Sequence, residues 1–321
     1  AAYTSGAVTA TISDHSIAAL SGLAETGNAY TISVTDTSLN ASDVLALGAK
    51  TTGNVNITAA TTMSGTYSDV YAVLSSDTYN HSDSTAVTLT DVVTAAHADT
   101  IASYQGGAVT ATVVADTANH LAGALLHATS SSSLTLTVTD ANVAASDLSS
   151  LAGKTSVAIN ATSVTTVTAS TLSALTSIYV TNAAKFNGLG NENITYTGTV
   201  ASDVNTAAGY TTGVLTATVA SGTASALNTA LSNASSTDQL TLTITDTTVA
   251  AATLHALDGK TAVAIDASSV TTVTGSASDV ESVYSSSGIS GLGNEAITVS
   301  GTISVSDANT IAAYTSGLVT A

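Results

Sequence analysis

A Tyr-x-x-Gly motif followed by a strand-like segment recurs along this chain at an almost fixed interval. The motif begins at Tyr3, Tyr104, Tyr210 and Tyr314, so the intervals are 101, 106 and 104 residues. Self-similarity at a fixed period is the sequence signature of a repeat architecture, in which each unit packs on its neighbours and not around one central core. The 321 residues therefore hold three full periods and the start of a fourth.

This period defines the predicted domain organisation. We expect one continuous domain over residues 1–321, with superrepeats at about 3–103, 104–209 and 210–313 and the start of a fourth at 314–321. The chain opens within a repeat at Ala1, without an initiator Met or a signal-peptide pattern, and is interpreted as a processed product or a window of a longer protein. Neither end carries a polar capping repeat, which predicts exposed strand edges that act as assembly templates.

The composition restricts the classes of partner. Four lysines and no arginine stand against 22 acidic residues, for a formal net charge of −18. Nucleic acids and anionic membranes are both bound through Lys and Arg, so no nucleic-acid partner is expected. No apolar run is long enough for a membrane span. Because cysteine is absent, stability must come from packing and backbone hydrogen bonds.

Each period contains about four strand-like segments. In the second period these segments are Ala108–Val113, Leu134–Asp140, Ser156–Asn160 and Asn193–Thr197. Apolar Val, Leu, Ile and Ala alternate in them with Thr, Ser and Asn, which is the period of a strand with one buried face. Val109 and Leu134 are expected to point into the core.

Short helical turns are predicted between the strands. After Asp36, Asp140 and Asp246 the apolar residues change to a helical spacing, at Leu39/Val44/Leu47, Val143/Leu148/Leu151 and Val249/Leu254/Leu257. Ser42-Asp43 and Ser146-Asp147 are expected to cap these turns, and Gly153 and Gly259 to end them in a left-handed conformation. A third, longer coil carries Tyr67, Val70, Tyr71 and Leu74; its counterparts close with Gly188-Leu-Gly-Asn-Glu192 and Gly291-Leu-Gly-Asn-Glu295.

A strand, a short helix, a turn and the next strand do not form a chain of hairpins. Successive strands are not joined by two-residue hairpin turns. A crossover that contains a helix implies parallel neighbours instead. We therefore predict a mostly-β fold with short helical turns, a parallel β-solenoid with about four coils of β/α type in each superrepeat.

The acidic residues offer one candidate cation site. Asp14 and Asp36 each follow an equivalent strand start by six positions, so in adjacent coils they could share a Ca²⁺ ion, which prefers oxygen ligands. The Gly-Gly-x-Gly-x-Asp motif of calcium-binding β-rolls is absent, and Asp36, Asp140 and Asp246 lie a whole period apart. We interpret these carboxylates as turn caps, keep Ca²⁺ as the alternative, and assign no metal-binding or cofactor-binding residue.

No catalytic constellation is found in the sequence. The six histidines recur at no common repeat position and show no metal-ligand spacing, so they are interpreted as incidental; they are His15, His81, His97, His120, His127 and His255. No serine lies in a nucleophile elbow followed by a partner histidine. The chain is predicted not to be an enzyme, and no catalytic residue is assigned.

Two repeated surface features each have two interpretations. Lys50, Lys154 and Lys260 lie at equivalent positions, where a cation complements the C-terminal dipole of a helix or forms a salt bridge to a neighbouring filament. Outward Thr-x-Thr pairs predict a hydroxyl-and-methyl array like that of ice-binding proteins, or reflect strand propensity alone. The pairs are Thr9/Thr11, Thr110/Thr112, Thr135/Thr137 and Thr241/Thr243, with interruptions at Ala158/Asn160 and Ala264/Asp266.

Four phrases of the third period carry a family resemblance: Leu240–Asp246, Leu257–Asp266, Ser269–Gly275 and Gly291–Gly301. They resemble the long repeats of giant cyanobacterial surface and secreted proteins, of the type implicated in the cell-surface layer of marine swimming Synechococcus. The resemblance implies an extracellular, structural or adhesive role. We therefore predict a secreted or cell-surface structural protein, a module of a filament or S-layer-like surface layer that assembles head-to-tail with itself or with flanking repeats. The alternative is an adhesin or ligand-binding stalk for glycans or ice.

Overall fold

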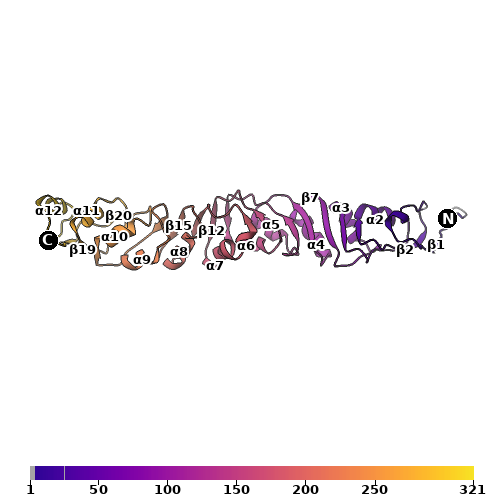
Figure 1. Ribbon diagram of the computed structural model, residues 1–321, viewed down its shortest axis with the longest axis horizontal. Helices are drawn as coiled ribbons and strands as arrows, with labels where there is room; N and C mark the ends of the chain where they lie inside the picture. The colour runs from indigo at the N-terminus through magenta and orange to yellow at the C-terminus, as the bar shows by residue number, and fades with distance from the viewer. Residues whose placement is uncertain (1–3, 25) are drawn as a thin grey trace. The chain divides into compact units, whose positions relative to one another are not determined.

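A computed structural model describes residues 4–24 and 26–321, so Tyr3, the first member of the repeated motif, lies outside the described residues. Within them, short helices alternate with short parallel strands in an α/β arrangement (Figure 1). The predicted mostly-β solenoid is wrong. The described residues form twelve α-helices, and their strands are distributed over six small, separate parallel sheets.

The helices are between four and ten residues long. They are α1 (Ile17–Leu20), α2 (Ala41–Gly48), α3 (Tyr67–Leu74), α4 (Ala95–Tyr104), α5 (Ala118–Ala124), α6 (Ala145–Ala152), α7 (Leu172–Thr176), α8 (Ala201–Ala208), α9 (Ala224–Ala230), α10 (Ala251–Asp258), α11 (Ala277–Ser285) and α12 (Val305–Ala312). A π-helical segment, η1 (Ser177–Thr181), continues α7, and a short 3₁₀ turn, η2 (Ala183–Lys185), follows it.

The prediction underestimated the helices because many of them have little apolar periodicity. The helices α4, α5, α9 and α12 are rich in Ala, Ser, Asn and Thr, and each starts at a side-chain cap. The hydroxyls of Thr94, Thr117, Thr223 and Ser304 accept the backbone N–H three residues later, at 3.1 to 3.3 Å. Such a cap satisfies a donor that the helix itself leaves without a partner.

The chain divides into two compact units. The first comprises Ala1–Asp140, Asp147–Ser163 and Asn182–Asn187. Its sheets have the strand orders β1-β2-β4-β6, β3-β5-β7-β8-β9 and β11-β13. The strands are β1 (Thr9–Thr11), β2 (Ala29–Ser33), β3 (Ser38–Asn40), β4 (Val55–Asn56), β5 (Thr62–Gly65), β6 (Tyr79–Asn80), β7 (Ala86–Val93), β8 (Val109–Val113), β9 (Ser133–Thr135), β11 (Ile159–Asn160) and β13 (Phe186–Asn187).

The second unit comprises Ala141–Ser146, Val164–Thr181 and Gly188–Ala321. Its sheets have the strand orders β10-β12-β14-β15-β16, β17-β19-β21-β22 and β18-β20. The strands are β10 (Asn142–Ala144), β12 (Thr166–Ala169), β14 (Asn193–Tyr196), β15 (Leu215–Thr218), β16 (Gln239–Thr241), β17 (Thr248–Ala250), β18 (Ile265–Asp266), β19 (Thr272–Gly275), β20 (Ile289–Ser290), β21 (Ala296–Val299) and β22 (Val319–Thr320).

The predicted parallel pairing is confirmed in both units. Paired residues on neighbouring strands are 20 to 27 positions apart in the sequence. Thr9 and Ala29 are at the short end of this range, and Thr166 and Asn193 are at the long end. The inward positions are also confirmed, since Val109 and Leu134 are both 0 % exposed. The superrepeat boundaries stay a prediction.

Helices of neighbouring strand–helix segments pack against one another within each unit. In the first unit α2 contacts α3 and α3 contacts α4; the three follow one another in Figure 1. Val44 and Leu47 of α2 are buried, as the helical spacing predicts. No helix of the described residues has the length and apolar character needed to cross a membrane.

The predicted helix boundaries need correction in three respects. Leu39, Val143 and Val249 lie on the strands β3, β10 and β17 and not in the helices that follow. Asn40, and not Ser42, caps α2, through a hydrogen bond from Ser42 N to Asn40 Oδ1 at 3.0 Å. Gly259 has a φ of −65° and Gly153 has no positive φ either, so neither α10 nor α6 ends in a left-handed residue.

Candidate functional site

Rows of polar side chains cross the outward faces of the sheets. In the first unit the register places Asn40, Ser64, Thr88, Thr110 and Ser133 side by side. Two rows in the second unit consist of Thr168, Thr195 and Thr216, and of Thr274, Thr298 and Thr320. Because neighbouring strands lie about 4.8 Å apart, each row is a ladder of polar side chains at that spacing, and all of them except Asn40 carry a hydroxyl group.

The predicted Thr-x-Thr array is present only in part. Thr110, Thr112 and Thr135 are exposed, whereas Thr137 and Thr243 are half-buried. The row through Thr168 ends at Ala144 on one side and at Gln239 on the other. Part of this row, with Thr197 and Ser170, lines a shallow groove of about 400 Å³ in the second unit.

The aspartates that end the Thr-Asp phrases cap helices. The Oδ2 atoms of Asp36, Asp140 and Asp246 accept the backbone N–H groups of Ile17, Ala118 and Ala224 at 2.9, 2.6 and 2.7 Å. Asp91 Oδ1 binds Tyr67 N in the same way, at 2.9 Å. A carboxylate at this position also compensates the positive end of the helix dipole. These side chains are caps, as interpreted from the sequence, but each caps a helix that precedes it by 19 to 24 residues.

Asp14 and Asp36, the candidate calcium ligands, do not belong to a larger group of metal-binding side chains within the described residues. Asp14 is exposed, and Asp36 is engaged with Ile17 N. Across residues 4–24 and 26–321, no three His, Asp or Glu side chains gather as a metal site requires.

Two buried glutamates were not singled out by the sequence analysis. Glu192 is 3 % and Glu295 is 1 % exposed. The carboxylate of Glu295 accepts Gly293 N at 2.6 and 2.7 Å, Asn294 N at 2.9 Å and the Tyr284 hydroxyl at 2.9 Å. Burial, followed by the hydrogen bond to Glu295, raises the pKa of Tyr284. The repeated Gly-x-Gly-Asn-Glu motif was the sequence signal for these buried glutamates. Gly293 has a φ of 134°, and this conformation turns successive backbone N–H groups toward the Glu295 carboxylate.

Glu192 has the same surroundings in the second repeat. It accepts Gly190 N at 2.7 Å, Asn191 N at 3.1 Å and the Tyr179 hydroxyl. Gly190 again has a positive φ, of 117°. The loop is therefore a recurrent structural joint.

The repeated Tyr-x-x-Gly motif packs on these joints. Tyr210 stacks on Tyr179 with ring centroids 5.5 Å apart, and Tyr314 stacks on Tyr284 at 5.2 Å. The next residue of the motif, Thr211, donates its hydroxyl hydrogen bond to the Glu192 carbonyl at 2.5 Å. This motif therefore connects two strand–helix segments within the second unit.

Two of the histidines hydrogen-bond to aspartates. Asp99, only 8 % exposed, accepts His127 N at 2.5 Å, His127 Nδ1 at 2.9 Å and Ala128 N at 3.2 Å. His120 Nδ1 lies 2.5 Å from Asp116 Oδ2. The hydrogen bond from Thr117 N, and then that from His120, lower the pKa of Asp116.

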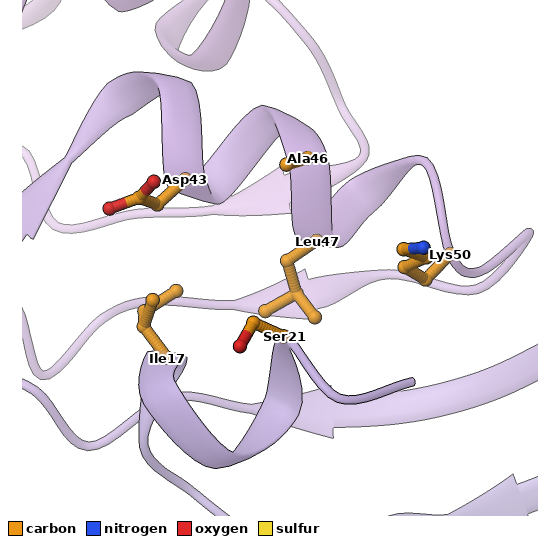
Figure 2. A pocket seen from close by; sticks show the side chains of 6 residues that line it. All are labelled: Ile17, Ser21, Asp43, Ala46, Leu47 and Lys50. Carbon is orange, nitrogen blue, oxygen red and sulfur yellow. The ribbon is translucent and has the colours of Figure 1, made fainter. Parts of the chain in front are cut away.

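The three equivalent lysines follow helix ends. Lys50, Lys154 and Lys260 each come two residues after the last residue of α2, α6 and α10. This position supports the interpretation that they complement the helix dipoles. Figure 2 shows Lys50 beside a small pocket between α1 and α2, together with Asp43 and Leu47. Its volume of about 90 Å³ is below the range of sites for drug-sized ligands, which is about 300 Å³ and more.

Comparisons of this chain with protein-family models, with curated proteins and with solved structures gave no match.

Proposed function

We propose that the chain is a structural protein, a repeat module of an extracellular filament or surface layer. The observation that carries the proposal is the use of its carboxylates. Asp36, Asp140 and Asp246 hold helix N-termini at the same place in successive repeats. Each of these three carboxylates thus joins the end of a strand segment to the helix that precedes it, and a repeat whose carboxylates serve its own packing in this way fits a structural role.

The proposed partner is the protein itself, as a second copy or as flanking repeats of the same chain. The strand β1 is an edge strand of its sheet. Val8 O and Ile12 N bond to β2, so by the alternation of a parallel ladder the N–H groups of Thr9 and Thr11 point to the other side. An edge of this kind accepts a further parallel strand.

Electron microscopy of the purified chain over a concentration series tests the proposal. Ordered fibres or sheets are expected, and light scattering should rise with concentration. A chain that sediments as a monomer at the highest concentration, with no ordered material on the grid, would overturn self-assembly.

A pair of variants tests the role of β1. Thr11→Pro removes an outward N–H group at an edge position where proline is sterically tolerated. It should abolish assembly and leave the circular dichroism spectrum unchanged. Thr11→Ala keeps the N–H group and serves as the matched control. Equal assembly by both variants would show that this edge is not the contact.

A further inference from the structure

Four aromatic rings gather on α3 and α4 in the first unit. Tyr67 stacks on Tyr71, with centroids 5.7 Å apart, and on His97, at 3.9 Å. Tyr104 meets Tyr71 edge to face at 6.0 Å. Tyr71 and Tyr104 remain 38 % and 37 % exposed. This aromatic cluster is unusual for a chain that has 11 Tyr, one Phe and no Trp.

A polar groove of about 550 Å³ adjoins Tyr104. Asp77, Asn80, His81 and Asp83 line it together with short serine side chains, and none of the four lysines does. Its volume falls within the range of small-molecule sites, about 300 to 1,000 Å³. The groove therefore combines one aromatic wall with several hydrogen-bond acceptors.

The other two repeats provide an internal comparison. There the corresponding tyrosines form simple stacked pairs, and one member of each pair binds a buried glutamate, Glu192 or Glu295. In the first repeat Thr85 occupies the position of that glutamate, as the register of Val87 with Val109 indicates. Tyr67 and His97 are additional rings. The repeat architecture thus accounts for the Tyr71–Tyr104 pair but not for Tyr67 and His97, nor for the loss of the buried glutamate, and these differences call for another explanation.

The loop that forms the groove is held in place by a buried amide. Gln105 is 5 % exposed. In the orientation that avoids placing oxygen against oxygen, its nitrogen lies 3.0 to 3.2 Å from the carbonyl oxygens of Ser82, Asp83 and Thr85, and its two N–H groups donate to these acceptors. Gly106 N adds a hydrogen bond to the Asp83 carbonyl at 2.6 Å. Such a preorganised loop loses little conformational entropy when a ligand binds.

We propose that the aromatic cluster and this groove form a binding site for a neutral saccharide. The face of a phenol ring is electron-rich and attracts the C–H groups on the flat side of a sugar ring. A carboxylate acts only as a hydrogen-bond acceptor, and the hydroxyl groups of a sugar can supply the donors. Anionic saccharides are disfavoured, because Asp77 and Asp83 are negative and no cation lines the groove. A helical protein partner would instead need aliphatic contacts, and Leu74 is the aliphatic side chain in this lining.

Affinity electrophoresis of the full chain tests this proposal. Native gels would contain starch, galactomannan, xyloglucan or mixed-linkage β-glucan as neutral probes, and alginate as the anionic probe. The chain should be retarded in at least one neutral gel and not by alginate. Retardation in none of the neutral gels, or by alginate alone, would overturn the proposal.

Variants then locate the site. Tyr104→Ala should weaken the retardation by about tenfold, because one stacking surface is lost. Tyr314→Ala, which removes the corresponding ring of the third repeat, should bind like the wild type. Equal retardation of both variants would place binding elsewhere and overturn the proposal.

A fluorescent variant separates loss of binding from loss of folding. Because the chain has no Trp, Tyr104→Trp places a unique fluorophore at the groove and keeps an aromatic face. Its emission should shift on titration with oligosaccharides of the retarding polysaccharide. An unchanged emission over the binding range would contradict the assignment. This site does not depend on self-assembly, so fibres without saccharide binding would refute the site and leave the proposed function standing.

Discussion

The hydroxyl of Tyr284 donates a hydrogen bond to the carboxylate of Glu295 at 2.9 Å, and Glu295 is 1 % exposed. This contact fixes the end of α11 to the loop that carries Glu295. A hydrogen bond to a buried charge contributes about 1.5 to 3 kcal/mol. Tyr284→Phe should therefore lower the free energy of unfolding by about that amount at neutral pH, measured by denaturant titration. Tyr314→Phe is the control, since Tyr314 stacks on the same ring.

The same pair predicts a pH dependence. Burial and the hydrogen bond to Glu295 raise the pKa of Tyr284 above its ordinary value of 10.0. The folded state therefore holds this proton more tightly, so the stability from Tyr284 is complete below pH 10 and falls as pH rises further. The fall cannot exceed ~1.4 kcal/mol per pH unit, because the folded and unfolded states differ by at most one bound proton at Tyr284. The phenol is half-buried, which limits the size of the pKa shift and so the pH range of the fall.

Unfolding at pH 7 and about pH 10.5 measures this effect. The stability difference between the wild type and Tyr284→Phe should narrow at the higher pH, because the variant has no proton to lose there. A difference that is constant or larger at the higher pH would contradict the raised pKa.

The carboxylate caps predict a second set of stability changes. Asp246 Oδ2 accepts Ala224 N at 2.7 Å across 22 residues. Asp246→Ala should lower the unfolding free energy by about 0.5 to 2 kcal/mol, the usual range for a lost N-cap. Asp246→Asn keeps an acceptor oxygen, so its unfolding free energy should lie between those of the wild type and Asp246→Ala. Asp14→Ala, at an exposed aspartate, should change stability by less than about 0.5 kcal/mol. Equal losses from Asp246→Ala and Asp14→Ala would refute the capping role.

The alternation on β8 predicts a strong difference between adjacent positions. Val109 is 0 % exposed, and Thr110 is exposed on the opposite face. Val109→Asp buries a charge without a partner and should cost on the order of 4 kcal/mol or more. Thr110→Asp should cost less than about 1 kcal/mol, because its charge stays in water. Thermal melting distinguishes the two variants, and similar melting temperatures would show that the assigned faces are wrong.

The buried faces and the parallel pairing could be predicted because they follow from local patterns. Alternation with period two predicts that Val109 and Leu134 are buried, and this prediction does not depend on which strands they pair with. Helical crossovers between strands imply parallel neighbours without any knowledge of the sheets.

The helix content could not be predicted in this way. Among the apolar side chains of α5, Leu121 and Ala118 are buried, and this gives too weak a pattern to identify a helix. Its N-terminus is held by Asp140, 22 residues away, which becomes a neighbour only after the strands have paired. The aromatic cluster has the same origin. Tyr67 and His97 are far apart in the sequence and meet because α3 packs on α4.

The glycine of the repeated Tyr-x-x-Gly motif yields the final prediction. A Cβ atom at Gly213 would lie 2.7 Å from the carbonyl carbon of Glu192 and 2.9 Å from the Asn191 oxygen. Backbone atoms cannot move aside as a flexible side chain does. Gly213→Ala must therefore displace the loop that holds the Glu192 carboxylate.

Overpacking of this kind costs about 1 to 3 kcal/mol. Gly153→Ala is the matched control, because the nearest atom to its Cβ would be Ser150 O at 3.9 Å. It should be neutral, or stabilising by up to about 1 kcal/mol through the lower entropy of the unfolded chain. Denaturant unfolding of both variants compares the two effects. If Gly213→Ala were as stable as Gly153→Ala, close backbone approach would not be the reason for glycine in the motif. The displaced loop should also weaken the hydrogen bond between Tyr179 and Glu192, so the near-ultraviolet circular dichroism of the tyrosines should change in Gly213→Ala alone.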